Sequence, residues 1–88
     1  MEPQSVIDQL SDLNPDAHLF ENMNAALIGI GRAGHKDPVA VYSKSKIFVK
    51  LLSDGLSEED AAEYFYGKFV NAWAGDNTPV IIDDATEN

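Results

Sequence analysis

The stretch ALIGIGRAGHKDPVAVY, residues 26–42, decides the fold of this chain. Two apolar runs rich in β-branched residues, 26–32 and 38–42, flank the loop-forming segment AGHKD, a pattern typical of a β-hairpin. Strict alternation predicts that Ile28 and Ile30 share one face of the first strand, opposite the neighbouring leucine and glycines. We therefore place a two-stranded hairpin at the centre of the fold.

Downstream of the hairpin, the apolar period changes from two residues to about 3.6, which predicts two helices. The first is capped by Ser43 or Ser45 and ends at Gly55. The second covers residues 57–74 and begins with Ser-Glu-Glu-Asp, in which the hydroxyl caps the helix and the carboxylates meet its positive dipole end. Gly75 stops it. The predicted buried faces comprise Ile47, Phe48, Leu51 and Leu52 in the first helix, and Ala62, Phe65, Phe69, Ala72 and Trp73 in the second.

Shorter elements are predicted on both sides of this region. Upstream, apolar residues at helical spacing predict a helix over residues 3–13, which the turn signal Asn14-Pro15 ends. Nothing local decides the structure of residues 16–24. Downstream, PVII at 79–82 predicts a third short strand, and DDATEN at 83–88 is expected to be a frayed acidic tail.

The predicted order is therefore helix, two strands, two helices, strand, which indicates an α+β fold. We expect one small domain over residues 1–88, with an N-terminal helical arm at 1–24, an α+β core at 26–82 and the acidic tail. The expected sheet is three-stranded, mainly antiparallel, and covered on one face by two helices. The N-terminal helix either completes the core or exchanges with a second copy, and the thin core makes a homodimer a further expectation.

Composition excludes several classes of protein. The chain has 88 residues, with 15 acidic against 6 basic side chains and a net charge of -9, a balance that repels nucleic acid. It has no cysteine, hence no disulfide and no thiolate chemistry. No signal peptide or membrane span is evident in the sequence. We expect a soluble cytoplasmic protein with no membrane partner and no direct nucleic-acid partner.

The charges are segregated along the chain. All six basic residues lie between Arg32 and Lys68, and five of them lie within residues 32–50. One interpretation is that oppositely charged segments fold against one another and solvate the surface. The other is a polarised surface, on which an acidic side meets a basic partner and a small basic patch holds an anion.

The hairpin carries a motif that could belong to a nucleotide site. Residues 29–34 fit G-x-G-x-x-G, but no helix follows and the chain is too short for a doubly wound sheet, so chance or strand packing explains the glycines better. A less specific hypothesis is an anion site, in which the hairpin turn presents backbone N–H groups and nearby cations to a phosphate or nucleotide. The candidate anion contacts are Arg32, His35, Lys36, Lys46 and Lys50.

The outer face of the helix at 57–74 is the stronger candidate for a functional surface. At 100° per residue, Tyr64 falls almost opposite the stripe of Phe65 and Phe69. An amphipathic aromatic among carboxylates is typical of a protein contact. The candidate contact residues are Glu59, Asp60, Glu63, Tyr64 and Tyr66. Alternatively, the N-terminal helix packs over this face and makes it part of the core.

Catalysis has little support in the sequence. The two histidines have no spacing to acidic ligands that indicates a metal site, the serines occupy caps and turns, and no nucleophile elbow occurs. Carboxylates at helix starts and in tails are solvated, so they are poor general acids or bases. We expect no enzymatic activity, no cofactor and no metal.

One block resembles a known family. ALIGIGR, PVAVYS, DGLSEEDAAEYF and AWAGDNTPV, within residues 26–82, resemble small proteins encoded by tailed bacteriophages. The family has no assigned activity, so the resemblance implies a phage origin and action in the host cytoplasm, without catalytic residues. The N-terminal helix lies outside the block and would be a partner-specific or dimerising addition.

Three roles follow from these observations. The leading one is a non-catalytic acidic accessory protein that binds a host protein, as an inhibitor of a nucleic-acid-binding or defence factor. The second is a small module that binds or sequesters an anion or nucleotide through the basic hairpin. The third is a minor structural or assembly component of the virion.

Overall fold

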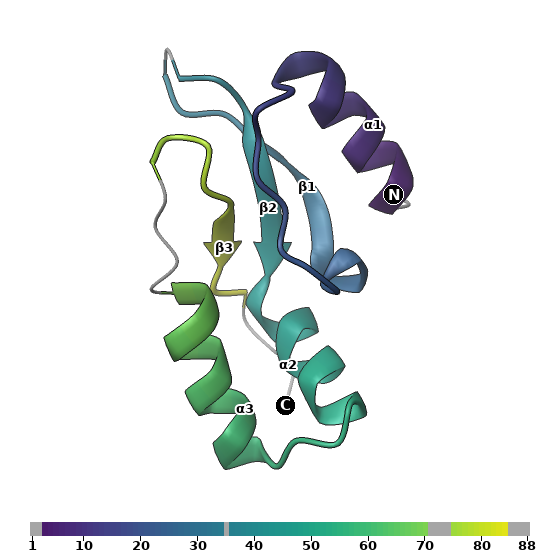
Figure 1. The fold of residues 1–88 in the computed structure, drawn as a ribbon, viewed down its shortest axis with the longest axis vertical. Coiled ribbons are helices and arrows are strands. Elements are labelled where there is room, and N and C mark those ends of the chain that lie inside the picture. Colours follow the sequence, from purple (N-terminus) through teal and green to yellow (C-terminus); the bar gives the residue numbers. More distant parts are fainter. Residues whose placement is uncertain (1–2, 35, 71–74, 85–88) are drawn as a thin grey trace.

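The computed structural model describes residues 3–34, 36–70 and 75–84 and confirms a small α+β domain (Figure 1). The predicted order of helices and strands is also confirmed. In chain order the elements are α1 (Pro3–Leu13), the 3-10 helix η1 (Asn24–Ala26), β1 (Leu27–Gly31), β2 (Val39–Ser43), α2 (Lys44–Ser53), α3 (Glu58–Tyr64), the π-helix η2 (Phe65–Val70) and β3 (Val80–Ile82). Within the described residues, no helix is long and apolar enough to cross a membrane.

The three-stranded sheet is mixed rather than purely antiparallel. Its strand order is β1-β2-β3, with β1 antiparallel to β2 and β3 parallel to β2. A parallel pair needs a long crossover connection, and here α2, α3 and η2 provide it. The chain leaves β2, descends along α2 and ascends along α3, so that β3 runs in the same direction as β2 (Figure 1).

A β-bulge changes the predicted faces of β1. Leu27 pairs with Tyr42 and Gly29 pairs with Val41, so Ile28 is an extra residue without a partner in β2. After such an insertion the alternation shifts by one residue. Leu27 and Ile30 consequently share the face toward the core, while Ile28 is 37% exposed. The expectation that Ile28 and Ile30 share a face is therefore wrong.

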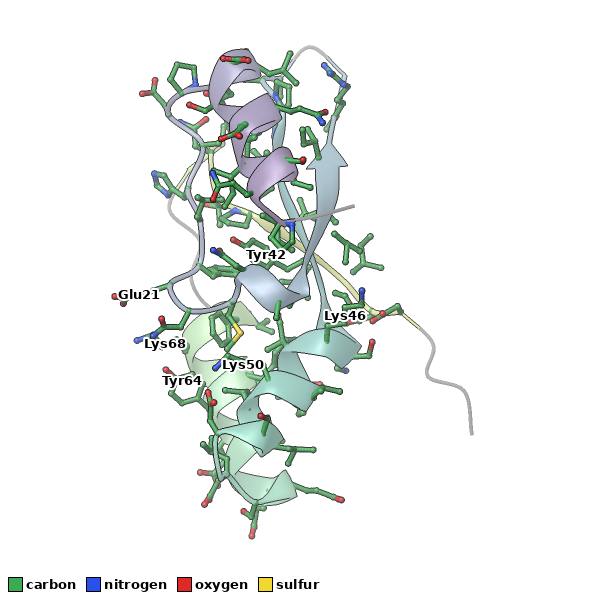
Figure 2. All side chains as sticks on the ribbon, turned by 90° about the vertical axis from the view of Figure 1, so that its right-hand side faces the viewer. Glu21, Tyr42, Lys46, Lys50, Tyr64 and Lys68 are labelled. Carbon is green, nitrogen blue, oxygen red and sulfur yellow. The ribbon has the colours of Figure 1, made fainter. Side chains whose placement is uncertain are left out.

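The helices do not cover the sheet as expected. Instead of two helices lying on one face, α1 lies against β1 and β2, and α2 and α3 form a hairpin beyond the end of the sheet (Figures 1 and 2). The cause is local, because Ser43 is both the last residue of β2 and the cap of α2. With no loop between them, the helix continues away from the strand end.

The core extends from α1 to the helical hairpin through one buried cluster. Val6 and Leu10 of α1 belong to it, as do Tyr42 at the end of β2, Ile47 of α2 and Phe65 of η2. The N-terminal helix thus completes the core of its own chain. Burial raises the pKa of Tyr42, while the backbone N–H of Phe20, which donates to its hydroxyl at 3.0 Å, opposes this effect.

The predicted buried faces of α2 and α3 are partly wrong. In α2, Ile47 and Leu51 are buried, but Leu52 is exposed. In α3, Ala61 rather than Ala62 is fully buried, and Ala72 and Trp73 lie outside the described residues.

The acidic C-terminal segment is not frayed at its start. The Asp84 carboxylate accepts hydrogen bonds from the hydroxyls of Ser43 and Ser45, at 2.6 and 2.7 Å, and from the backbone N–H of Ser45 at 3.0 Å. The hydroxyl of Ser43 in turn accepts from the N–H of Lys46 at 3.2 Å. Asp84 and the two serines therefore cap α2 together, and residues 85–88 lie outside the description.

Candidate functional site

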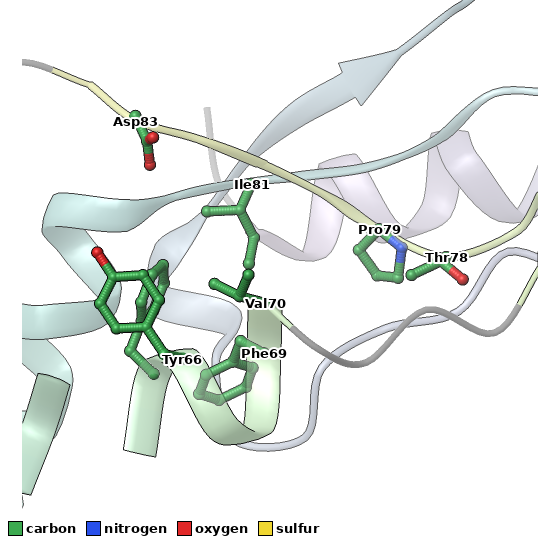
Figure 3. A pocket seen from close by; sticks show the side chains of 8 residues that line it. Tyr66, Phe69, Val70, Thr78, Pro79, Ile81 and Asp83 are labelled. Carbon is green, nitrogen blue, oxygen red and sulfur yellow. The ribbon is translucent and has the colours of Figure 1, made fainter. Parts of the chain in front are cut away.

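An apolar groove lies between η2 and β3 (Figure 3). Its volume is about 300 Å³. One wall comes from η2 and the other from β3 and the residues on either side of it. We call it the aromatic groove, and the residues that line it are Phe65, Tyr66, Phe69, Val70, Thr78, Pro79, Ile81 and Asp83.

The π-helix η2 provides one wall of this groove and also changes the position of Tyr64 at the end of α3. A π-helix bonds residue i to i+5 rather than i+4, so side chains five apart approach one another. The rings of Tyr64 and Phe69 are accordingly 5.7 Å apart. The expectation that Tyr64 lies opposite Phe69 assumed α-helical geometry throughout and is wrong. Tyr64, Tyr66 and Val70 nevertheless remain 42%, 51% and 50% exposed, so the end of α3 and η2 present an apolar surface to solvent.

The predicted protein-contact residues lie on the α3–η2 segment. Glu59, Asp60, Glu63, Tyr64 and Tyr66 are all exposed, and the first two belong to the first turn of α3. The serine cap is as predicted, since the Ser57 hydroxyl accepts from the N–H of Asp60 at 3.1 Å. The alternative, in which the N-terminal helix covers this face, is wrong because α1 packs on β1 and β2 at the other end of the molecule (Figures 1 and 2). The two tyrosines border different cavities, since Tyr66 lines the aromatic groove and Tyr64 lines a separate cavity with Lys68. We call the five exposed residues of this segment together the acidic aromatic face.

Lys44 was not among the site residues predicted from the sequence. Its side chain reaches the end of the aromatic groove. Its ammonium donates to the Tyr66 hydroxyl at 3.3 Å and lies 4.0 Å from an Asp83 carboxylate oxygen. It is also 5.6 Å from the ring centroids of Phe65 and Tyr66 and 6.0 Å from that of Phe48. The spacing of Lys44 and Phe48, four residues apart in one helix, was a usable signal. The other partners lie more than twenty residues away in sequence.

A second cavity adjoins the groove at Lys44. Its volume is about 650 Å³, and Asp83 lines both spaces. We call it the outer cavity, and its lining residues are Lys44, Ser45, Phe48, Val49, Leu52, Glu58, Asp83 and Asp84. The hydrogen bonds from the Ser43 hydroxyl, the Ser45 N–H and the Ser45 hydroxyl hold the pKa of Asp84 well below its usual range. Asp84 therefore contributes a negative charge to this cavity.

The predicted anion contacts are not gathered in one place. Arg32 and Lys36 line a cavity of about 230 Å³ at the hairpin, but Asp37 and Asp76 line it too, and the Lys36 ammonium is 3.5 Å from Asp76.

The remaining cations belong to other parts of the chain. Lys46 and Lys50 lie on α2, well away from the hairpin turn (Figure 2), and Lys50 pairs with Asp54 at 2.7 Å. His35 lies outside the described residues.

The buried Tyr42 hydroxyl is covered by Phe20 and the core, out of reach of a substrate. Among residues 3–34, 36–70 and 75–84, no group of three or more histidine, aspartate or glutamate side chains is arranged to bind a metal ion. No family model matches the chain, and no curated protein or solved structure is detectably similar to it.

Proposed function

We propose that this chain is a non-catalytic, acidic phage accessory protein that binds a host protein through the acidic aromatic face. The observation that carries the proposal is the exposure of Tyr64, Tyr66 and Val70 beside the acidic first turn of α3. Tyrosine provides a large contact area at low entropic cost and is enriched where proteins meet. The phage origin and the host cytoplasm as the place of action rest on the family resemblance of residues 26–82.

The charge of the chain supports a basic partner. A net charge of -9 accelerates association with a positively charged surface and disfavours acidic competitors. Surfaces that bind nucleic acid are positively charged. A host nucleic-acid-binding or defence factor is therefore the class of partner that this face fits, and covering the basic surface would inhibit it.

Affinity capture from nuclease-treated host extract tests this proposal. The informative variant is Glu59→Lys with Glu63→Lys, which reverses two charges on the acidic aromatic face. Asp8→Lys with Asp12→Lys on α1 is the matched control, because both residues are exposed and the formal net charge changes by the same amount. We expect one dominant partner that the first variant loses and the control retains.

The affinity of the purified pair then tests the electrostatic basis. Because exposed charges are screened within about 8 Å at 0.15 M salt and about 3 Å at 1 M, the dissociation constant should rise with salt concentration. A constant that stays the same from low to high salt, or equal loss in both charge variants, would contradict the proposal.

An anion-binding module remains the second candidate, since Arg32 and Lys36 line one cavity. A bound nucleotide raises the melting temperature of the protein, and the rise increases with the logarithm of its affinity for the folded state. ATP and polyphosphate should therefore stabilise the wild type and not an Arg32→Ala variant if this role applies. Detection of the chain in purified virions would instead support the third role, a minor structural or assembly component.

A further inference from the structure

The environment of the Lys44 ammonium is unusual for a surface lysine. Three aromatic rings, those of Phe48, Phe65 and Tyr66, have their centroids within 6.0 Å of it. Significant cation–π contacts occur about once per 70–80 residues, yet three converge here on one side chain. The Asp83 carboxylate, 4.0 Å from the ammonium, completes an enclosure typical of a binding site for an organic cation. We call these three rings and Asp83 the cation box.

Lys44 does not occupy this position to stabilise its own helix. It is the first residue of α2, where the helix dipole favours negative charge and disfavours a cation. Asp84 already provides the favourable charge at this end. The rings and Asp83 therefore compensate for an unfavourable location of the ammonium.

The space around Lys44 suits a second cation. Lys44 lines the outer cavity and contacts Tyr66 of the aromatic groove, and Tyr66 and Asp83 lie at the same end of that groove (Figure 3). Its side chain is 31% exposed, so it can turn outward without crossing the core. The other charged residues that line the outer cavity among the described residues are carboxylates: Glu58, Asp83 and Asp84.

We propose that Lys44 is an internal substitute for a lysine or arginine side chain of the partner, which displaces it and inserts into the cation box. The inference rests on the proposed function and specifies the partner's chemistry. The inserted residue projects from a basic segment, because the vacated cavity offers aromatic faces and carboxylates. Aromatic faces attract an ammonium or guanidinium, and most strongly when the cation is desolvated. Because Tyr66 is 51% exposed and the Asp83 side chain 82% exposed, the attraction here has the scale of an exposed site.

The test uses a small probe, the peptide acetyl-Gly-Lys-Gly-amide, titrated into the full chain while the ring resonances of Phe48, Phe65 and Tyr66 are followed by NMR. Lys44→Met removes the competing ammonium and keeps an apolar stem. Lys46→Met, two residues along the same helix and exposed, removes the same charge elsewhere. We expect Lys44→Met to bind the probe about fivefold more tightly than the wild type does, the scale of one exposed cation–π contact, and Lys46→Met to match the wild type.

Two further controls separate a cation site from apolar adhesion. The peptide with norleucine in place of lysine has no charge and should not bind, and adding Tyr66→Leu to Lys44→Met should abolish the gain. Melting curves check that each variant is folded, with Lys44→Gln as the substitute if the methionine variant is not. Equal affinity of the Lys44 and Lys46 variants for the probe would overturn the inference.

The two proposals can fail separately. Reversing Glu59 and Glu63 could abolish capture of the partner while Lys44→Met binds the peptide no more tightly than the wild type does. That result would support the acidic aromatic face as the contact surface and contradict the cation box. If the peptide binds Lys44→Met more tightly while no partner depends on Glu59 and Glu63, the box stands as a cation site without the proposed contact face.

Discussion

Gly31 allows β1 to approach β2 closely, and its replacement gives a prediction at the scale of one residue. A Cβ atom there would lie 2.8 Å from Cγ2 of Val41, and a valine in a strand has little rotamer freedom with which to yield. We expect Gly31→Ala to lower the free energy of unfolding by about 1–3 kcal/mol. Urea denaturation measures this loss.

Gly29 of the same strand is the matched control. A Cβ atom there meets nothing within 4 Å, so Gly29→Ala should be neutral or stabilising by about 0.5–1 kcal/mol, because alanine loses less backbone entropy than glycine. In a Val41→Ala background, Gly31→Ala should cost less, since the blocking methyl is gone. Equal effects of the two glycine substitutions would contradict the close approach.

Single residues also limit what a sequence can predict about strand faces. Alternation correctly identified β1, but Ile28 is inserted in a bulge, which moves Ile30 onto the core face. The bulge depends on pairing with β2 rather than on any property of the isoleucine. A pattern within one strand therefore predicts that the strand exists but not where its register shifts.

At the scale of elements, the start of α2 gives a prediction about acid stability. The pKa of Asp84 is lowered in the folded protein, first of all by the hydrogen bond from Ser43, so the folded state binds its proton less readily than the unfolded state does. The stabilisation is thus present above the unfolded pKa of about 3.9 and is lost as the pH falls through the folded pKa. Asp84→Asn should therefore flatten the decline in melting temperature between about pH 5 and pH 2.

An exposed carboxylate far from these serines provides the control for that decline. Asp12 lies on α1 and is exposed, so Asp12→Asn removes one carboxylate without touching the cap. As the pH falls, the melting temperature of Asp12→Asn should decrease more steeply than that of Asp84→Asn. Circular dichroism at matched pH values measures both. Identical slopes would show that the cap of α2 does not depend on the Asp84 charge.

The elements themselves were predictable because their signals are local. The Ser57 cap, the apolar period of α2 and the hairpin composition all lie within a few residues of the structure that they specify. The parallel direction of β3 was not predictable in this way, since it follows from the length and angle of the intervening helices. The π-helical turn of η2 likewise differs from the α-helical spacing on which the position of Tyr64 was predicted.

At the scale of the whole molecule, the candidate site combines distant segments. The exposed tyrosines and acids of α3 and η2 could be predicted from their helix alone. The cation box could not, because α2, η2 and the residue after β3 contribute to it, and only the folded chain brings Lys44 to Tyr66 and Asp83. The distribution of charge along the sequence predicted that Lys46 and Lys50 join the hairpin cations in one anion site. In the fold they lie on α2, apart from the cavity that Arg32 and Lys36 line.

The uncompensated charge of the whole chain gives the last prediction, on the response of stability to salt. The net charge is -9, and the extents of the molecule are 38 × 25 × 23 Å. At 0.01 M salt the screening length is about 30 Å, so carboxylates repel one another across the whole molecule; at 0.15 M it is about 8 Å and only neighbours interact. Screening also weakens the surface pairs Lys36–Asp76, Lys44–Asp83 and Lys50–Asp54, but such pairs contribute only about 0–1 kcal/mol each.

We therefore expect repulsion to dominate and sodium chloride to stabilise the protein. If screening reduces the repulsion in the folded state by about 1 kcal/mol, the melting temperature should rise by about 4–8 °C for a domain of this size. Calorimetry at 0.01 and 0.15 M sodium chloride would detect this rise. The variants Glu59→Lys with Glu63→Lys and Asp8→Lys with Asp12→Lys carry less net charge, so both should show a smaller rise. A lower melting temperature at 0.15 M would mean that the three surface pairs outweigh the repulsion, because screening then removes more attraction than repulsion.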